Sequence, residues 1–225
     1  MNDRPVPDQR GLWIATYDEH RPGTGAPSAF AVTCLDLLPP LSHILELGCG
    51  AGNDAAAFAA AGHTVIATDF APNVIAANRA RLADLSNLAF EEMRIEKPYP
   101  FPDAALDAVY AHLTLHYYFH DITSTIVREI RRVLRPGGWL MFACKSPDDP
   151  AWGRGVEIEP DMFDLNGKVR HFFTPDYARA LLADGFTDIQ VASHRGRIYG
   201  TKSGWITATA RTATTDHSAH ISVLH

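Results

Sequence analysis

The chain of 225 residues is poor in cysteine, has no long hydrophobic run and has fewer basic than acidic residues. Its three cysteines, Cys34, Cys49 and Cys144, are odd in number and far apart, which predicts neither a disulfide framework nor a zinc site and favours a reducing compartment. No apolar run approaches the roughly 18 residues of a membrane span, and residues 1–18 lack the apolar centre of a signal peptide. The formal charge of −6 disfavours a nucleic-acid partner, which needs a basic surface. Together these absences predict a cytoplasmic protein.

What the chain does contain is a regular alternation of apolar strands and helical patterns. Strands are expected at residues 43–47, 64–68, 88–93, 106–111, 139–144, 189–193 and 205–210, the last two as a hairpin-like pair. Helices are expected at residues 29–38, 52–61, 71–85, 122–134 and 175–186. This spacing is typical of an α/β fold with a doubly wound, mostly parallel sheet.

The remaining segments predict a single domain, residues 1–211, with two appendages and a tail. Residues 1–28 form an N-terminal arm whose Trp13 and Tyr17 either pack on the surface or cover a site. Residues 145–173 lack a clear periodicity, and because long irregular segments are often lids, we expect a substrate lid there. The Thr-, Ser- and His-rich residues 212–225 predict a loose C-terminal tail.

The strongest functional signal is the stretch ILELGCGAGNDAAAFAAAGHTVIATD, from Ile44 to Asp69. Glycines after a strand allow a sharp turn and close approach of a ligand, and the next helix offers free N–H groups. A nicotinamide or flavin site needs G-x-G-x-x-G, whereas the third glycine here is Gly52, one residue early. No Gly-Lys-Ser/Thr follows, which excludes a Walker loop. Asp69 ends the next strand, about 20 residues on, where a carboxylate can accept both ribose hydroxyls.

Five motifs in order, namely ELGCGAG, Asp69, PFPDAALDAV, LHYY and RVLRPGG, resemble the class I S-adenosylmethionine-dependent methyltransferases over roughly residues 30–210. The resemblance implies a seven-stranded sheet with an antiparallel last strand, S-adenosylmethionine as cofactor and S-adenosylhomocysteine as product. It implies that Asp69 holds the ribose, that Phe70 lies against the adenine, and that the backbone of His112 faces the methionine end. The methionine part would be lined by the glycine loop, namely Glu46, Gly48, Cys49, Gly50 and Gly52.

One position departs from the family pattern. Many relatives have an aspartate near the end of the third strand that accepts a hydrogen bond from the adenine amino group. Arg94 stands there in this chain, and a guanidinium cannot accept a hydrogen bond. We therefore expect the backbone of Ile95, or Glu96, to contact the adenine.

Candidates for the chemistry follow the fourth strand, in HLTLHYYFHD. His112, His116 and His120 are spaced by four residues, which on one helix would suit a metal, but the family resemblance makes this segment a loop and short helix, so no metal is expected. The same resemblance implies that His116 lies near the methyl as a base or substrate contact; the alternative is a packing histidine under the lid. Tyr117, and His171 directly after the lid, are the other candidates.

The substrate class is inferred from the lid and from motifs that are missing. The lid resembles those of a small-molecule branch that includes tellurite-resistance-type enzymes, and its acids, Asp148, Asp149 and Glu157 among them, either bind a cation or form a solvated face. The chain has neither the Asn/Asp-Pro-Pro-Tyr motif of many enzymes that methylate amino groups on DNA, RNA or protein, nor a Pro-Cys pair that attacks a pyrimidine.

The sequence thus predicts a methyltransferase that acts on a small-molecule nucleophile by direct displacement, as a monomer or homodimer, with no nucleic-acid or membrane partner. Two alternatives remain open. One is a non-catalytic protein that binds the cofactor as a sensor or regulatory subunit. The other is an NAD-dependent oxidoreductase, against which the position of Gly52 speaks.

Overall fold

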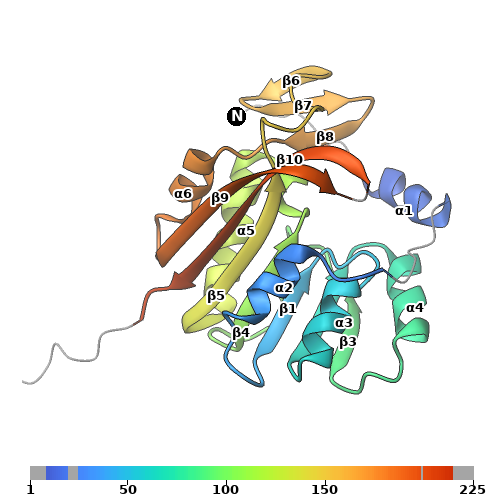
Figure 1. Ribbon diagram of the computed structural model, residues 1–225, viewed down its shortest axis with the longest axis vertical. Coiled ribbons are helices and arrows are strands. Elements are labelled where there is room, and N and C mark those ends of the chain that lie inside the picture. The colour runs from blue at the N-terminus through green and yellow to red at the C-terminus, as the bar shows by residue number, and fades with distance from the viewer. Residues whose placement is uncertain (1–8, 20–24, 199, 215–225) are drawn as a thin grey trace, which may run out of the picture.

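The computed structural model describes residues 9–19, 25–198 and 200–214 of the chain (Figure 1). A seven-stranded sheet in the order β3-β2-β1-β4-β5-β10-β9 forms its centre. The strands are β1 (His43–Leu47), β2 (Thr64–Asp69), β3 (Leu88–Glu92), β4 (Leu106–His112), β5 (Leu134–Lys145), β9 (Phe186–Ile198) and β10 (Thr201–Thr212). The pairs from β3 to β5 are parallel, and β10 is antiparallel to both of its neighbours. The predicted α/β fold with an antiparallel last strand is confirmed.

Five helices pack on the two faces of this sheet (Figure 1). One face carries α2 (Ala29–Leu35), α3 (Asn53–Ala60) and α4 (Pro72–Arg81), and the other carries α5 (His120–Val133) and α6 (Pro175–Leu182). Proline stands at the first turn of α4 and of α6, where its missing N–H costs no helical hydrogen bond. Thr174 caps α6 by accepting a hydrogen bond from the Tyr177 N–H at 3.0 Å. These local signals explain why the sequence located the helices well.

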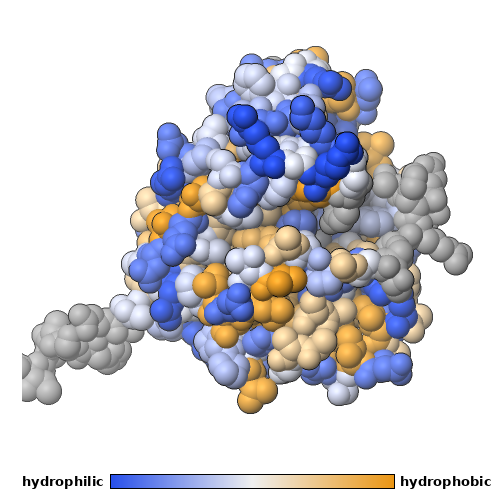
Figure 2. Space-filling model, viewed as in Figure 1, coloured by the Kyte–Doolittle hydropathy of each residue, from blue (hydrophilic) through white to orange (hydrophobic). Residues whose placement is uncertain are grey.

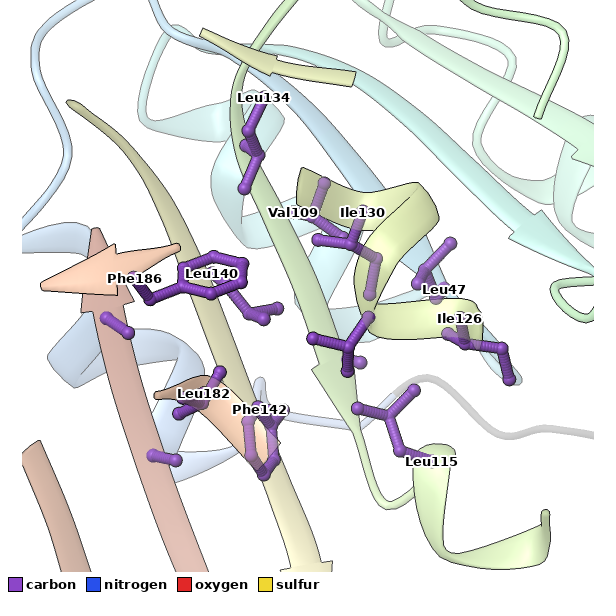
Figure 3. Close-up of a cluster of buried hydrophobic side chains, with 14 of the residues drawn as sticks. Leu47, Val109, Leu115, Ile126, Ile130, Leu134, Leu140, Phe142, Leu182 and Phe186 are labelled. Carbon is purple, nitrogen blue, oxygen red and sulfur yellow. The ribbon is translucent and has the colours of Figure 1, made fainter. Parts of the chain in front are cut away.

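Alternation along each strand sends side chains to two separate cores. In β1, Leu45 and Leu47 point to the α5–α6 side, where they pack with residues of β4 and β5 (Figure 3). Ile44, one residue out of phase, packs on the other face with Phe58 of α3. Because successive side chains alternate, Glu46 also points to the α2–α3 side, at the carboxyl end of β1. The hydrophobic pattern of β1 therefore determines on which face of the sheet the Glu46 side chain lies.

The structure differs from expectation in the N-terminal arm. Residues Arg10–Glu19 form a helix, α1, rather than an irregular arm. The segment has few helical signals of its own, but Trp13 contacts the rings of Tyr17 and Tyr117 at centroid distances of 6.2 and 5.0 Å. Tertiary packing therefore outweighs weak local propensity here.

The predicted lid is also more regular than its sequence suggests. It contains a small antiparallel sheet, β6 (Val156–Glu159), β7 (Met162–Leu165) and β8 (Lys168–His171), which lies at the top of Figure 1. Its β7–β8 turn is Asn166–Gly167, with φ values of +56° and +82°. An Asn-Gly pair is a strong hairpin signal, so this turn was recognisable from the sequence.

The C-terminal strands extend well beyond their predicted bounds. Residues 194–204, expected as the connection between two short strands, are mostly paired, so that β9 and β10 form one long hairpin. The cross-strand pair His194 and Trp205 stacks at a centroid distance of 5.4 Å, which stabilises this extension. The extra length carries the hairpin beyond the core, toward the end of the sheet at which parallel strands finish.

No helix among the described residues is long and apolar enough to cross a membrane. The predicted loose tail lies, from residue 215 on, outside the described residues. The same holds for residues 1–8 and 20–24 of the predicted arm.

Candidate active site

The glycine loop between β1 and α3 is built from three glycines in left-handed backbone conformation. Gly48, Gly50 and Gly52 have φ values of +68°, +49° and +69°. A Cβ on Gly48 would lie 2.5 Å from Thr114 Oγ1, and one on Gly52 would lie 2.9 Å from the ring of Phe90. Both positions therefore require glycine for conformation and for space. The loop also exposes Cys49 and Gly50 to a large cavity at the carboxyl end of the sheet.

Glu46 lies at the edge of this cavity, and one of its two carboxylate oxygens lacks a partner among the described residues. Its side chain is 3% exposed, and its Oε2 atom has no hydrogen bond among the described residues. Burial, followed by the nearby carboxylates of Asp54 and Asp69, raises the pKa of Glu46 well above its ordinary value. A buried carboxylate with a free oxygen and acidic neighbours is a site for a cationic ligand group.

Asp69, at the end of the adjacent strand β2, is oriented by the backbone. Its Oδ2 accepts a hydrogen bond from the Gly50 N–H at 3.1 Å, and its Oδ1 accepts one from the Ala71 N–H at 3.0 Å. A carboxylate has about four lone-pair sites, so both oxygens keep the capacity to accept from ligand hydroxyls. Burial raises the pKa of Asp69, and the backbone N–H groups partly offset this effect.

The next part of the cavity wall contains Phe70, Ile95 and Arg94, the residue that departs from the family pattern. Phe70 and Ile95 line the cavity together with Arg94 and Glu96. Arg94 forms an ion pair with Glu96, which occupies the carboxylate of Glu96. The backbone of Ile95 is thus the better of the two expected acceptors for an adenine amino group.

The cavity has a volume of about 1960 Å³, above the roughly 300–1000 Å³ of most small-molecule sites. It runs from the glycine loop to the small β6–β8 sheet and the β9–β10 hairpin. Helix α1 closes one side, because Tyr17 reaches the loop at Gly50 and Gln9 bonds to the opposite wall. The volume leaves room for a second molecule beside a nucleotide-sized ligand.

Of the residues after β4, His112 and Tyr117 line the cavity. His112 stacks on Tyr110 at 6.4 Å, and its Nδ1 lies 3.9 Å from Asp54 Oδ2. Burial lowers the pKa of His112, although Asp54 opposes the shift. Tyr117 ends the short 3₁₀ helix η1 (Leu115–Tyr117), and its ring lies edge-on to Trp13.

His116 and His171 are not among the residues that line the cavity. His116 is 0% exposed, and neither of its ring nitrogens has a hydrogen-bond partner among the described residues. Burial, then the positive charge of Arg170, lowers its pKa well below the ordinary value. His171 packs between His120 and Tyr177 at centroid distances of 4.2 and 4.5 Å, and burial lowers its pKa to about 3.

The spacing of His112, His116 and His120 does not create a shared helical face. The first ends β4, the second lies in η1 and the third begins α5, so the three side chains belong to different elements. Among the residues the structure describes, no three His, Cys, Asp or Glu side chains gather as a metal site would require.

The structure also adds residues that the sequence did not single out. Lys145, at the end of β5, donates hydrogen bonds to Asp149 Oδ2 at 2.8 Å and to Ser203 Oγ at 2.7 Å, and it faces the cavity. Its position directly after a parallel strand was a usable signal, because ligands bind at that edge of the sheet. Arg170 of β8 lines the cavity as well, but nothing in its sequence context distinguished it.

Comparison with known proteins agrees with this geometry. Residues 45–142 match a family model described as a methyltransferase domain. A demethylmenaquinone methyltransferase of Beutenbergia cavernae is 31% identical over 106 residues, which are 46% of this chain and 41% of that protein. A fatty-acid O-methyltransferase of Mycolicibacterium smegmatis is 31% identical over 120 residues, or 52% of this chain and 43% of that protein. The chain spans less than half the length of these curated relatives.

A solved structure resembles almost the whole chain. The 1,6-didemethyltoxoflavin-N1-methyltransferase of Burkholderia thailandensis, with bound 1,6-didemethyltoxoflavin and S-adenosylhomocysteine, has a TM-score of 0.73 and 22% sequence identity. The match covers 94% of this chain and 93% of that one, and it establishes the shared fold. The chain therefore shares the fold of this methyltransferase, and its residues 45–142 are similar to a methyltransferase domain.

Proposed function

We propose that the chain transfers the methyl group of S-adenosylmethionine to a small-molecule nucleophile by direct displacement, in a reducing cytoplasm. The observation that carries this proposal is the unpartnered Oε2 atom of Glu46, a residue that lines the same cavity as Asp69. The two acids lie at the ends of adjacent parallel strands, where this fold binds ligands. The similarity to a demethylmenaquinone methyltransferase and a fatty-acid O-methyltransferase supports a small molecule as the acceptor.

The residues present suit the cofactor. When bound, S-adenosylmethionine supplies an electrophilic methyl group on a sulfonium. Glu46 would accept a hydrogen bond from the ammonium of the methionine part, alongside Gly48, Cys49, Gly50 and Gly52 of the loop. Asp69 would accept from the ribose hydroxyls, and Phe70 with the Ile95 backbone would contact the adenine.

The other side of the cavity would position the acceptor and exclude water. Trp13 and Tyr17 of α1 and Tyr117 of η1 form an aromatic wall of this cavity, and His112 also lines it. Positioning and water exclusion supply much of the acceleration of a displacement reaction. Tyr117 is our candidate for direct contact with the acceptor. His116, with its ring centroid 4.3 Å from that of Tyr117, would support it from behind, and His171 would support the lid.

Cofactor binding is tested by calorimetry with S-adenosylhomocysteine and with NAD on the full chain. We expect S-adenosylhomocysteine to bind and NAD to bind far more weakly; the reverse would refute the cofactor assignment. Asp69→Ala is expected to weaken S-adenosylhomocysteine binding by about 1–3 kcal/mol, because it removes the ribose acceptor. An unchanged affinity would exclude that role for Asp69.

Transfer itself is tested with methyl-labelled S-adenosylmethionine and a metabolite extract. Label in a small molecule is the expected result. Good cofactor binding without label in any small molecule would instead favour the non-catalytic sensor or regulatory subunit.

A further inference from the structure

The far end of the cavity is basic in a chain that is acidic as a whole. We call the part lined by residues 145–154, β8 and the β9–β10 hairpin the acceptor end. The basic side chains that line it are Lys145, Arg154, Lys168, Arg170, Arg197 and Lys202. Asp149 is the one carboxylate among the described residues that line this part, and it is already bonded to Lys145. With a formal chain charge of −6, this local excess of positive charge is not a consequence of composition.

Arg170 is a half-buried cation at the acceptor end, and its side chain is hydrogen-bonded to that of Tyr117. Its Nε atom is buried without a hydrogen-bond partner, and no carboxylate of the described residues lies within ion-pair distance of it. The positive charge of Arg170 also acts on two neighbouring groups. It is the second cause, after burial, of the lowered pKa of Lys168 and of His116. A partly buried guanidinium without a counter-charge is costly, and an anionic ligand group would offset that cost.

Two lysines that line the same cavity as Arg170 can still donate hydrogen bonds to a ligand. Lys145 uses two of its three ammonium hydrogens on Asp149 and Ser203, which holds the third in a defined direction. Lys168, two residues before Arg170 on β8, lies over the Trp13 ring at 4.1 Å from the centroid and has no ion pair among the described residues. A cation–π contact leaves the ammonium hydrogens on its other side free for an anion.

The surroundings of these cations are aromatic. Trp13 and Tyr117, in edge contact at 5.0 Å, form the wall next to Lys168. Flat aromatic walls bind flat apolar bodies, and a few placed polar groups fix the orientation. On the outer surface, hydrophilic side chains gather over the small sheet at the top of the molecule, whereas hydrophobic patches lie lower, near α2 (Figure 2).

From this arrangement we infer that the acceptor end binds a flat apolar molecule through an anionic oxygen group, a carboxylate or a phenolate, held by Arg170 with Lys168 and Lys145 beside it. The inference rests on the proposed function, since it names the substrate class of the same site.

The test is calorimetry on the full chain saturated with S-adenosylhomocysteine, with naphthoate, naphthamide and ionised naphthol as probes. Naphthoate and naphthamide have nearly the same shape and differ in charge. We expect at least one of the two anions to bind about tenfold more tightly than naphthamide, a difference that added salt reduces. If naphthoate shows the larger gain over naphthamide, the favoured group is a carboxylate; if ionised naphthol does, it is a phenolate.

The preference is assigned to Arg170 with three variants. Arg170→Gln is expected to abolish the preference for the anion, Arg170→Lys to retain part of it, and Arg128→Gln, at an exposed position on α5, to leave it unchanged. If Arg170→Gln fails to fold, the same preference for the anion is measured with Lys168→Gln, at another position on the cavity wall, and it is expected to decrease. Equal binding of charged and neutral probes, with S-adenosylhomocysteine still bound, would overturn the inference alone. Loss of S-adenosylhomocysteine binding in the unaltered chain would instead overturn the proposed function.

Discussion

At the residue scale, burial of the Glu46 carboxylate lowers the stability of the folded chain at neutral pH, while the same carboxylate is proposed to bind the cofactor. Its raised pKa means that the folded chain holds a proton that the unfolded chain releases between the ordinary value of 4.5 and the folded value. Stability is therefore lost as the pH rises through that window. Glu46→Gln removes this penalty and is expected to raise the melting temperature of the ligand-free protein at neutral pH.

The same substitution is expected to weaken S-adenosylhomocysteine binding by about 1–3 kcal/mol, because the amide cannot compensate a cationic group. Binding to the unaltered chain should also release a proton, since a bound ammonium favours the ionised form of Glu46. Calorimetry in buffers with different ionisation heats measures that proton. Glu46→Gln with unchanged affinity and unchanged proton release would contradict this role.

His116 requires a separate test, because its sequence context and its burial point to different roles. We expect His116→Phe to change kcat/KM less than tenfold, since the ring lies behind the cavity wall and makes no hydrogen bond among the described residues. Loss of a general base typically costs about 10²–10⁴-fold. A decrease of that size, with the pH profile flattened and folding intact, would support the role that the sequence suggested.

The cofactor side of the site was readable from the sequence for a physical reason. Gly52, Glu46 and Asp69 stand in a contiguous strand-loop-helix-strand unit, where local backbone rules place them within reach of one ligand. Arg170 and Lys145 are brought together by the lid and the sheet, across separations in sequence that no local rule covers. The sequence therefore predicted which residues meet at the carboxyl ends of β1 and β2, but not which residues meet at the acceptor end.

At the element scale, α1 links two parts of the site. Gln9, at its start, donates a hydrogen bond to the Tyr117 carbonyl at 3.2 Å and accepts one from the Val169 N–H at 3.0 Å. Gln9→Ala removes both bonds, each contributing about 0.5–1.5 kcal/mol. We expect S-adenosylhomocysteine to dissociate several-fold faster, as measured by stopped-flow tryptophan fluorescence. Thr125→Ala, exposed on α5, is the control, and equal rates in both variants would mean that α1 does not retain the ligand.

Helix α1 and the β6–β8 sheet were the elements least predictable from the sequence. Both are stabilised by contacts with other parts of the chain. The Trp13–Tyr117 contact and the Gln9–Val169 bond join them to each other and to η1. Such contacts leave no periodic pattern in the chain, which is why a helix appeared as an arm. The Asn166–Gly167 turn was the exception, since its signal is local.

At the scale of the whole molecule, binding and folding are linked. A ligand that binds only the folded chain adds about 2.7 kcal/mol at a concentration of 100 times its Kd. For a chain of this size, 1 kcal/mol corresponds to about 2–4 °C in Tm. We expect S-adenosylhomocysteine at that concentration to raise Tm by about 5–10 °C in a thermal melt, and Glu46→Gln to reduce the shift. An unchanged Tm would mean that the cavity does not bind the ligand.

The attachment of α1 has a consequence for how turnover responds to its surroundings. Tyr17 of α1 lies against the glycine loop at Gly50. Gln9, the residue just before α1, accepts a hydrogen bond from the lid strand β8. If the chain transfers methyl groups as proposed, this one helix would cover both the spent cofactor and the methylated product. A chain that retains S-adenosylhomocysteine between cycles responds to the ratio of fresh to spent cofactor rather than to the supply of either one. We therefore expect product inhibition to be a built-in property of this fold.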